Sequence, residues 1–196
     1  IDVMKRYEVR HIVYTGAAKE NAFFKAFMGE IVKQTKTREY ARYIEVRERQ
    51  TWDISGVSVH ILFPDKPVED TEFESNDTSI VMKLSYGSQD VLLTADAEER
   101  LESYLVETYG SELQSEILKV GHHGSDTSSI PEFLAVIKPE HAVISSGKDN
   151  PYGHPSGRVL RRLENMQAQI WRNDTEGDIL FALTTSSAYV EIRKTN

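Results

Sequence analysis

The spacing of apolar residues along the chain predicts a series of short strands and helices. Runs of β-branched, aromatic and aliphatic residues that end near Gly or Pro are typical of strands, and apolar residues recurring on one helical face indicate helices. We expect strands over residues 9–15, 41–46, 57–63, 79–86, 90–94, 116–120, 141–145, 168–172, 178–184 and 188–193. We expect helices over residues 20–35, 98–109, 131–137 and 155–166. This alternation predicts an α/β layered fold, to which the last two strands would add an antiparallel edge.

The segment from Asp65 to Asp77 interrupts this pattern, because it holds six acidic residues and a proline. Runs of carboxylates are usually exposed to water, so we expect a solvated loop. A cluster of metal ligands is the alternative interpretation of the same residues.

Composition narrows the class of protein. With 196 residues, of which 39% are hydrophobic, the chain is expected to form a single domain over residues 1–196. The net charge of -8 gives no general attraction for nucleic acid unless metal ions or a local patch supply positive charge. The absence of cysteine excludes disulfides, cysteine-ligated metal centres and thiol nucleophiles. No apolar run is long enough to span a membrane, and the sequence sets neither the compartment, cytoplasmic or extracytoplasmic, nor the oligomeric state.

Polar residues gather where predicted strands end. Asp96 follows the strand over 90–94, and by itself it is either the N-cap of the next helix or a metal ligand. His122 and His123 follow the strand over 116–120 between two glycines, and imidazole is a common metal ligand. Because adjacent side chains diverge, we expect one histidine to bind a metal ion and the other to support it or to transfer protons.

A third strand end leads into the Gly- and Pro-containing segment 145–155, which holds Lys148 and His154. One interpretation of this segment is an ordinary loop before a helix. The other is a loop that binds a phosphate or carboxylate through Lys148, His154 and the N-terminus of the following helix. Reactive groups in open α/β sheets gather beyond the strand ends, so the three segments together predict one site. Nitrogen and oxygen donors fit zinc best, with manganese or iron as alternatives.

These three segments resemble the metallo-β-lactamase superfamily. The runs LLTADAE, LKVGHHGSDTSS and AVISSGKDNPYGHP are similar to the subgroup that includes the soluble domain of ComEC-type competence proteins and free-standing metal-dependent hydrolases. The resemblance covers about residues 76–177. It implies a four-layer αββα sandwich, incomplete at the N-terminus of this chain. It also implies two divalent metal ions that activate a water molecule to hydrolyse a phosphodiester, in a small molecule or a nucleic acid, or another ester.

The resemblance also assigns roles to individual residues. Asp96 matches the carboxylate that bridges the two metal ions, and His122 or His123 matches a later histidine ligand, with His122 favoured. Asn76 lies where many members have another histidine ligand, so it would position water or substrate. His154 matches a position near the substrate pocket, and either His123 or His154 would protonate the leaving group.

Two features depart from the family pattern. Ala95 stands where a glycine usually precedes the bridging aspartate, which is tolerable only at negative φ. The His-x-His-x-Asp-His metal motif is absent, since His11 and His60 each stand alone, and we expect that motif upstream of Ile1 in a longer polypeptide.

The remaining residues supply too few ligands for a catalytic zinc site, so a second hypothesis stays open. The chain would then be a catalytically silent binding or interaction module. A serine hydrolase that uses Ser125 or Ser145 is disfavoured, because no Gly-x-Ser-x-Gly motif is present.

Overall fold

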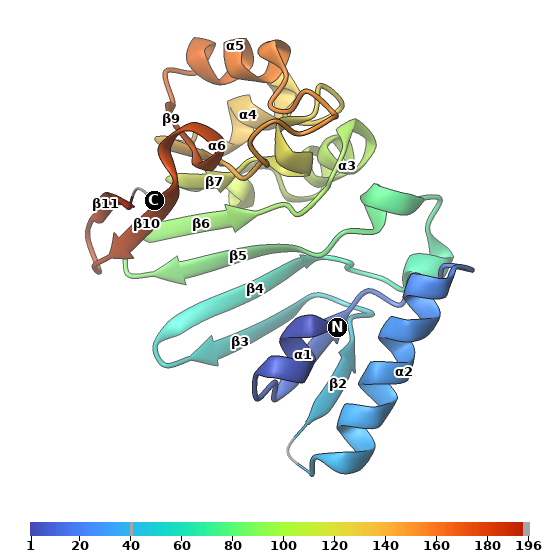
Figure 1. The fold of residues 1–196 in the computed structure, drawn as a ribbon. Helices are drawn as coiled ribbons and strands as arrows, with labels where there is room; N and C mark the ends of the chain where they lie inside the picture. Colours follow the sequence, from blue (N-terminus) through green and yellow to red (C-terminus); the bar gives the residue numbers. More distant parts are fainter. Residues whose placement is uncertain (40, 194–196) are drawn as a thin grey trace.

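The centre of the molecule is a seven-stranded mixed sheet of order β3-β4-β5-β6-β7-β8-β9 (Figure 1). The computed structural model describes residues 1–39 and 41–193. The strands of the sheet are β3 (Gln50–Ile54), β4 (Val57–Phe63), β5 (Val81–Tyr86), β6 (Gln89–Leu93), β7 (Ile117–Lys119), β8 (His141–Ile144) and β9 (Gln169–Arg172). Neighbours from β3 to β6 pair antiparallel, and those from β6 to β9 pair parallel.

One face of this sheet is covered by the helices that connect its parallel strands (Figure 1). These helices are α3 (Glu99–Tyr109), α4 (Pro131–Ile137) and α5 (Gly157–Asn165). Their apolar residues pack against the inward side chains of the strands to form the main hydrophobic core, in which Leu92, Leu118 and Phe133 are fully buried. Burial of these side chains stabilises the crossover connections and thereby holds the strand ends in place.

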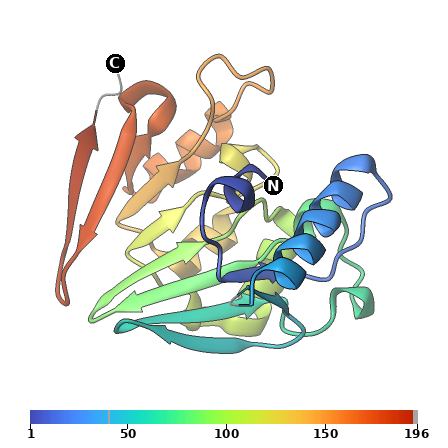
Figure 2. The ribbon, with the colours of Figure 1, turned by 60° about the horizontal axis from the view of Figure 1, so that its bottom comes forward.

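The last two strands form a ribbon of their own. β10 (Asp178–Leu183) and β11 (Ala188–Arg193) pair antiparallel with each other, and α6 (Asn173–Glu176) precedes them. Figure 2 shows this ribbon in red, apart from the other strands. The expectation that these strands extend the edge of the main sheet is wrong, because in the described part of the chain they pair only with each other, and β9 remains the edge of the main sheet.

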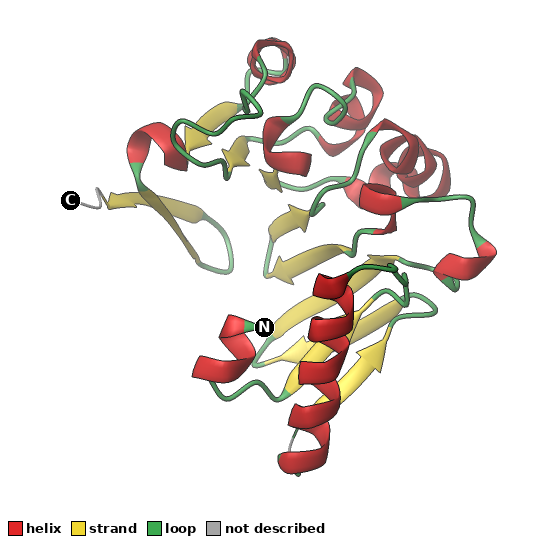
Figure 3. Ribbon diagram, turned by 45° about the vertical axis from the view of Figure 1, so that its right-hand side comes forward, coloured by secondary structure: helices red, strands yellow, loops and turns green. Residues whose placement is uncertain are grey.

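The opposite face of the sheet is covered by the N-terminal part of the chain (Figure 3). There β1 (His11–Tyr14) and β2 (Arg42–Glu45) pair parallel, and α1 (Asp2–Arg6) and α2 (Ala22–Thr37) lie beside them. A second cluster joins Val13 and Val46 to Val59 of the sheet. A third cluster joins the strand pair to the two helices through Met4, Ile12 and Ile31.

All predicted strands and helices have counterparts in the structure, and three elements were not predicted: α1, β3 and α6. β3 has a mixed polar sequence and is mostly exposed at the edge of the sheet, so its apolar alternation is weak. The acidic segment is not a simple solvated loop, because it forms the short 3-10 helices η1 (Val68–Asp70) and η2 (Ser75–Thr78). Asp77 in particular is buried, and its Oδ1 accepts the backbone N–H of Glu98 at 2.8 Å.

Two further 3-10 helices complete the fold, η3 (Gly110–Leu113) and η4 (Gly121–Gly124). Within residues 1–39 and 41–193, every helix is too short or too polar to cross a lipid bilayer.

Candidate functional site

The candidate site lies at the carboxyl ends of β6, β7 and β8. Because these neighbouring strands are parallel, the segments that follow them leave the sheet at the same edge (Figure 1). Thr94 Oγ1 donates to the carbonyl of Lys119 at 2.9 Å, and His122 N donates to the carbonyl of Ala95 at 3.0 Å. The first two segments are therefore joined directly beyond the sheet.

Asp96 stands in the turn after β6. Its backbone N–H donates to Ser79 Oγ at 3.2 Å, and its carboxylate is 45% exposed. Helix α3 begins at Glu99 with Glu98 as its N-cap, so the interpretation of Asp96 as the N-cap is wrong. Ala95 has a φ of 49°, which is the unfavourable case for a residue that carries a Cβ.

The two histidines occupy η4, where both have positive φ, 44° for His122 and 56° for His123. His123 lies beside Asp96, with 3.6 Å between Nε2 and Oδ1. Its other ring nitrogen, Nδ1, lies 2.7 Å from the carbonyl oxygen of Ser145. A carbonyl oxygen only accepts hydrogen bonds, so Nδ1 carries the proton. In the neutral ring, Nε2 and the Asp96 carboxylate therefore present lone pairs to one another, an arrangement that a cation between them would satisfy.

His122 points to a different carboxylate. Its Nδ1 lies 2.9 Å from Oε1 of Glu98, but the geometry is not that of a hydrogen bond, and this buried nitrogen has no hydrogen-bond partner in the described structure. The same Glu98 oxygen accepts from Asn76 Nδ2 at 3.2 Å and from Thr127 Oγ1 at 3.1 Å. Asn76 is thus placed at the site by its contact with a carboxylate.

Glu98 is the site residue that the sequence prediction missed. The apolar pattern marks it only as the start of a helix, although it follows Asp96 by two positions and ends the same LLTADAE run. A second carboxylate so close to the strand end was the available signal. The contact with His122 depends on the left-handed backbone conformation of the two histidines, which spacing alone does not predict.

His154 completes the group of imidazoles. Its ring centroid lies 5.7 Å from that of His122, and the His122 and His123 centroids are 6.2 Å apart. Burial lowers the pKa of His154, and the nearby His122 and His123 lower it further, while Asp126 opposes the shift. His154 is accordingly neutral near pH 7 and able to accept a proton or a hydrogen bond.

Two glycines allow these segments to pack so closely. A Cβ at Gly124, whose φ is +81°, would lie 2.7 Å from Cβ of Pro155. A Cβ at Gly121 would lie 2.9 Å from the carbonyl oxygen of Ala97. The contact of Gly124 with Pro155 brings His154 to the other histidines. The two close approaches together explain why glycine stands on each side of the histidine pair.

Lys148 lies elsewhere on its loop. It is exposed and lines a hollow of about 560 Å³ with Ser146 and residues 173–178. The structure brings Asp96, His122, His123, His154 and Asn76 together but places Lys148 toward this other hollow. The prediction that Lys148 contacts substrate stays a prediction.

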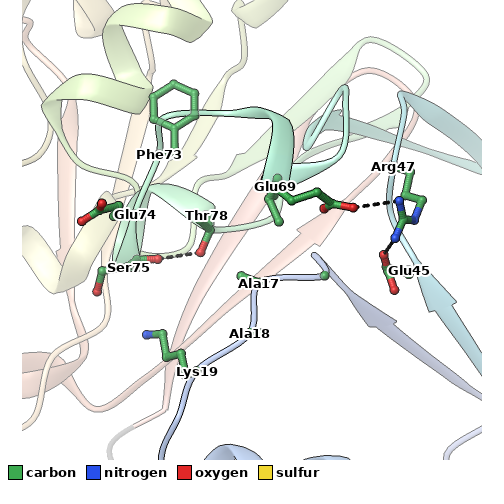
Figure 4. Close-up of a pocket in the computed structure, with 12 residues that line it drawn as sticks. Ala17, Ala18, Lys19, Glu45, Arg47, Glu69, Phe73, Glu74, Ser75 and Thr78 are labelled. Atoms are coloured by element: carbon green, nitrogen blue, oxygen red, sulfur yellow. Dashed lines mark hydrogen bonds and ion pairs between the residues drawn. The ribbon is translucent and has the colours of Figure 1, made fainter.

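A hollow of about 650 Å³ lies beside η2, and none of the candidate-site residues named above lines it (Figure 4). Ser75 and Thr78 of η2 line it, together with the loop 16–19 and several charged residues. Arg47 is paired there with Glu45 and Glu69, as the dashed lines show. Because the charge of Arg47 is compensated by these two carboxylates, Arg47 does not indicate a binding site for an anionic ligand.

The donor set fits a metal ion only in part. Within the described residues, no group of three or more His, Asp or Glu side chains is arranged to hold a metal ion. The structure instead contains two pairs, Asp96 with His123 and Glu98 with His122. A catalytic zinc site uses three protein ligands, so each pair is a partial donor set.

Fold and site together define a layered α/β domain with a histidine and carboxylate cluster at its strand ends. The sequence profile of the Metallo-beta-lactamase superfamily matches residues 6–148. The chain belongs to this superfamily, and its relatives include proteins named for competence.

Three relatives illustrate the relationship. Competence protein ComA of Neisseria gonorrhoeae is 37% identical over 134 residues, 68% of this chain and 19% of that protein. ComE operon protein 3 of Bacillus subtilis is 29% identical over 179 residues, 91% of this chain and 22% of that protein. Recombination protein 2 of Haemophilus influenzae is 34% identical over 128 residues, 65% of this chain and 16% of that protein. The chain thus spans only about a fifth of the length of these relatives.

The fold also resembles a solved structure. CmlA, a diiron beta-hydroxylase from Streptomyces venezuelae, matches with a TM-score of 0.50 and 12% sequence identity, over 83% of this chain and 43% of that chain. At this identity the likeness concerns the fold alone.

Proposed function

We propose that this protein is a metal-dependent hydrolase that cleaves phosphodiester or other ester bonds. One observation carries the proposal. Nε2 of His123 and Oδ1 of Asp96 face one another at 3.6 Å, while Ser145 fixes the proton of His123 on the opposite nitrogen. Membership in the superfamily supports a metal ion as the cation that joins them.

In this proposal Asp96, His122 and His123 contribute ligands to two divalent ions, with zinc preferred and manganese or iron as alternatives. When bound, such ions supply a water molecule of lowered pKa as the nucleophile. The chain would then form most of an αββα sandwich, in which a longer polypeptide provides the remaining strands and the His-x-His-x-Asp-His ligands. The three clusters of buried residues between successive layers are consistent with that arrangement.

The other residues of the site would act on the substrate. His154, or His123 where it is not a ligand, would protonate the leaving group. Because His154 is neutral near pH 7, it would first accept the proton released by the attacking water. Asn76 would orient water or substrate from its position against Glu98. Lys148 would contact a phosphate only if its loop turned toward the histidines. Relatives named for competence and recombination favour nucleic acid as the source of the phosphodiester.

Hydrolysis of a simple phosphodiester by the full-length polypeptide, with added zinc or manganese, tests the proposal. We expect Asp96→Asn to lower kcat/KM by a factor of about 100 or more, because a ligand of the reacting centre is lost. Glu107→Gln, an exposed charge change on α3, is the matched control and should keep full activity. Equal activity of Asp96→Asn and the native protein would rule out a role for Asp96 at the centre.

The second candidate function is a catalytically silent binding or interaction module. It is favoured by the arrangement of the donors in separate pairs, since neither pair alone completes a catalytic site. The melting temperature distinguishes the two functions, because a metal ion that binds only the folded state stabilises it by RT ln(1 + [L]/Kd). No rise in melting temperature at saturating zinc favours the silent module.

A further inference from the structure

We infer that Tyr152, stacked on His154, is the platform on which a nucleobase of a single-stranded substrate stacks beside the bond to be cut. The inference rests on the proposed function, because it assigns the ring to the substrate of that site. It concerns a residue outside the proposed metal ligands and a part of the substrate that does not react.

The first observation is the orientation of two rings. The Tyr152 and His154 rings are nearly parallel, with an interplanar angle of 16° and centroids 5.9 Å apart. Tyr152 is 79% exposed, so the face of its ring that does not meet His154 is open to solvent. An exposed Tyr whose ring is already stacked on one side offers a flat apolar surface on the other.

The second observation is that the loop backbone on both sides of Tyr152 is held by hydrogen bonds before any ligand arrives. Asn150 Nδ2 donates to the carbonyl oxygens of Gly147 and His154, at 2.8 and 2.6 Å, and Asn150 Oδ1 accepts the N–H of His154 at 3.0 Å. Ser156 N donates to the carbonyl of Gly124 at 2.9 Å and ties the end of the loop to η4. Figure 2 shows the segment between β8 and α5 as a light-orange arm. A ring carried on a backbone that is already ordered loses less conformational entropy when a ligand stacks on it.

The third observation is the position of the pair. His154 contacts His122 edge to face and Tyr152 nearly in parallel, so its ring connects Tyr152 to the histidines of the candidate site. A nucleotide whose phosphate lies at the histidines would have its base within reach of Tyr152. The chain has a net charge of -8, and stacking supplies affinity that does not depend on attraction between charges.

The binding of a short fluorescent oligothymidylate, followed by fluorescence anisotropy in the presence of a chelator, tests the inference. We expect Tyr152→Ala to weaken binding by about 5- to 150-fold, the effect of losing one stacked base, and Tyr152→Phe to bind as the native protein does. Tyr189→Ala, at an exposed tyrosine of the β10–β11 ribbon, is the matched control and should leave the affinity unchanged. An abasic oligonucleotide of the same length should bind the native protein and Tyr152→Ala equally.

Equal binding of oligothymidylate by Tyr152→Ala and the native protein overturns the inference. It is also overturned if the native protein binds the abasic strand as tightly as oligothymidylate. The chelator prevents hydrolysis, so this assay measures binding alone. A protein that binds oligothymidylate through Tyr152 but hydrolyses no phosphodiester would support this inference and contradict the proposed function. A protein that hydrolyses phosphodiesters but binds oligothymidylate equally well without Tyr152 would do the reverse.

Discussion

Ala95 illustrates how a single residue sets the geometry of the candidate site. Its backbone enters the left-handed region immediately before Asp96, and its carbonyl accepts the N–H of His122 at 3.0 Å. The sequence predicts that a methyl group is unfavourable here if φ is positive, but it does not fix the sign of φ. That sign follows from the tertiary contact between the segments after β6 and β7.

Ala95→Gly should raise the stability of the protein. The left-handed conformation costs an alanine about 1–2 kcal/mol, and the greater freedom of glycine in the unfolded chain offsets about 0.5–1 kcal/mol of the gain. We therefore expect a net stabilisation of up to about 1.5 kcal/mol, measured by urea denaturation. Ala97→Gly is the matched control at a fully buried position, and it should destabilise instead. A loss of stability in both variants would contradict the strain at Ala95.

The contacts of individual side chains were the part of the site that the sequence predicted least well. Asp96 and the histidine pair stand out from the sequence because they interrupt apolar strand ends. Thr127 does not stand out, and the signal from Glu98 is weak, since hydroxyl residues are common in loops and acidic residues at helix starts. Their contacts arise because the segment that follows η4 lies against the start of α3, where Glu99 N donates to the Thr127 carbonyl at 2.8 Å. Such a contact depends on backbone geometry that spacing does not record.

At the scale of elements, Glu102 joins α3 to the segment that follows the histidines. Its carboxylate is fully buried, and its two oxygens accept the backbone N–H groups of Ser129 and Ile130 at 2.7 and 2.8 Å. Arg162 of α5 donates to the carbonyl of Ser128 at 2.8 Å and so approaches the same turn. These contacts hold the start of α4 and, through it, the exit of the loop that carries His122 and His123.

Glu102→Gln should destabilise the protein by about 1–3 kcal/mol, because the amide leaves one of the two buried N–H groups without an acceptor.

Burial raises the pKa of Glu102 to about 8. The folded state then takes up a proton that the unfolded state releases above its usual carboxyl pKa, so stability should fall as pH rises from about 4.5 to 8. Denaturation midpoints measured across this range check both effects. A native slope that persists unchanged in Glu102→Gln would show that other groups cause it.

Elements with strong patterns were predicted well, and those with weak patterns were not. The strands β6, β7 and β8 contain short apolar runs, and the helices between them have apolar residues at helical spacing, with Gly110 or Pro131 marking an end. β3 is short, polar and on the edge, and α1 and α6 are each about a turn long, so neither length nor periodicity distinguishes them. The pairing of β10 with β11 was predictable, but their separation from the main sheet was not, because strand patterns carry no information about which sheet a hairpin joins.

At the scale of the whole molecule, the fold brings distant segments to one edge. Asn76 precedes the β5–β6 hairpin, Asp96 follows it, and the histidines and the Tyr152 loop come from two later crossovers. The parallel order of β6, β7 and β8 accounts for this convergence, and it was predictable from the alternation of strands and helices. The pairing of the donors, Asp96 with His123 and Glu98 with His122, came only from the structure.

Calorimetric titration of the protein with zinc tests the central claim that Asp96 and the histidines bind a shared metal centre. The native protein should bind zinc, and Asp96→Asn and His123→Ala should each weaken its affinity by at least about tenfold, because each removes a donor of the facing pair. Glu107→Gln should bind as the native protein does. Zinc affinities that are the same in the native protein, Asp96→Asn and His123→Ala would contradict the claim.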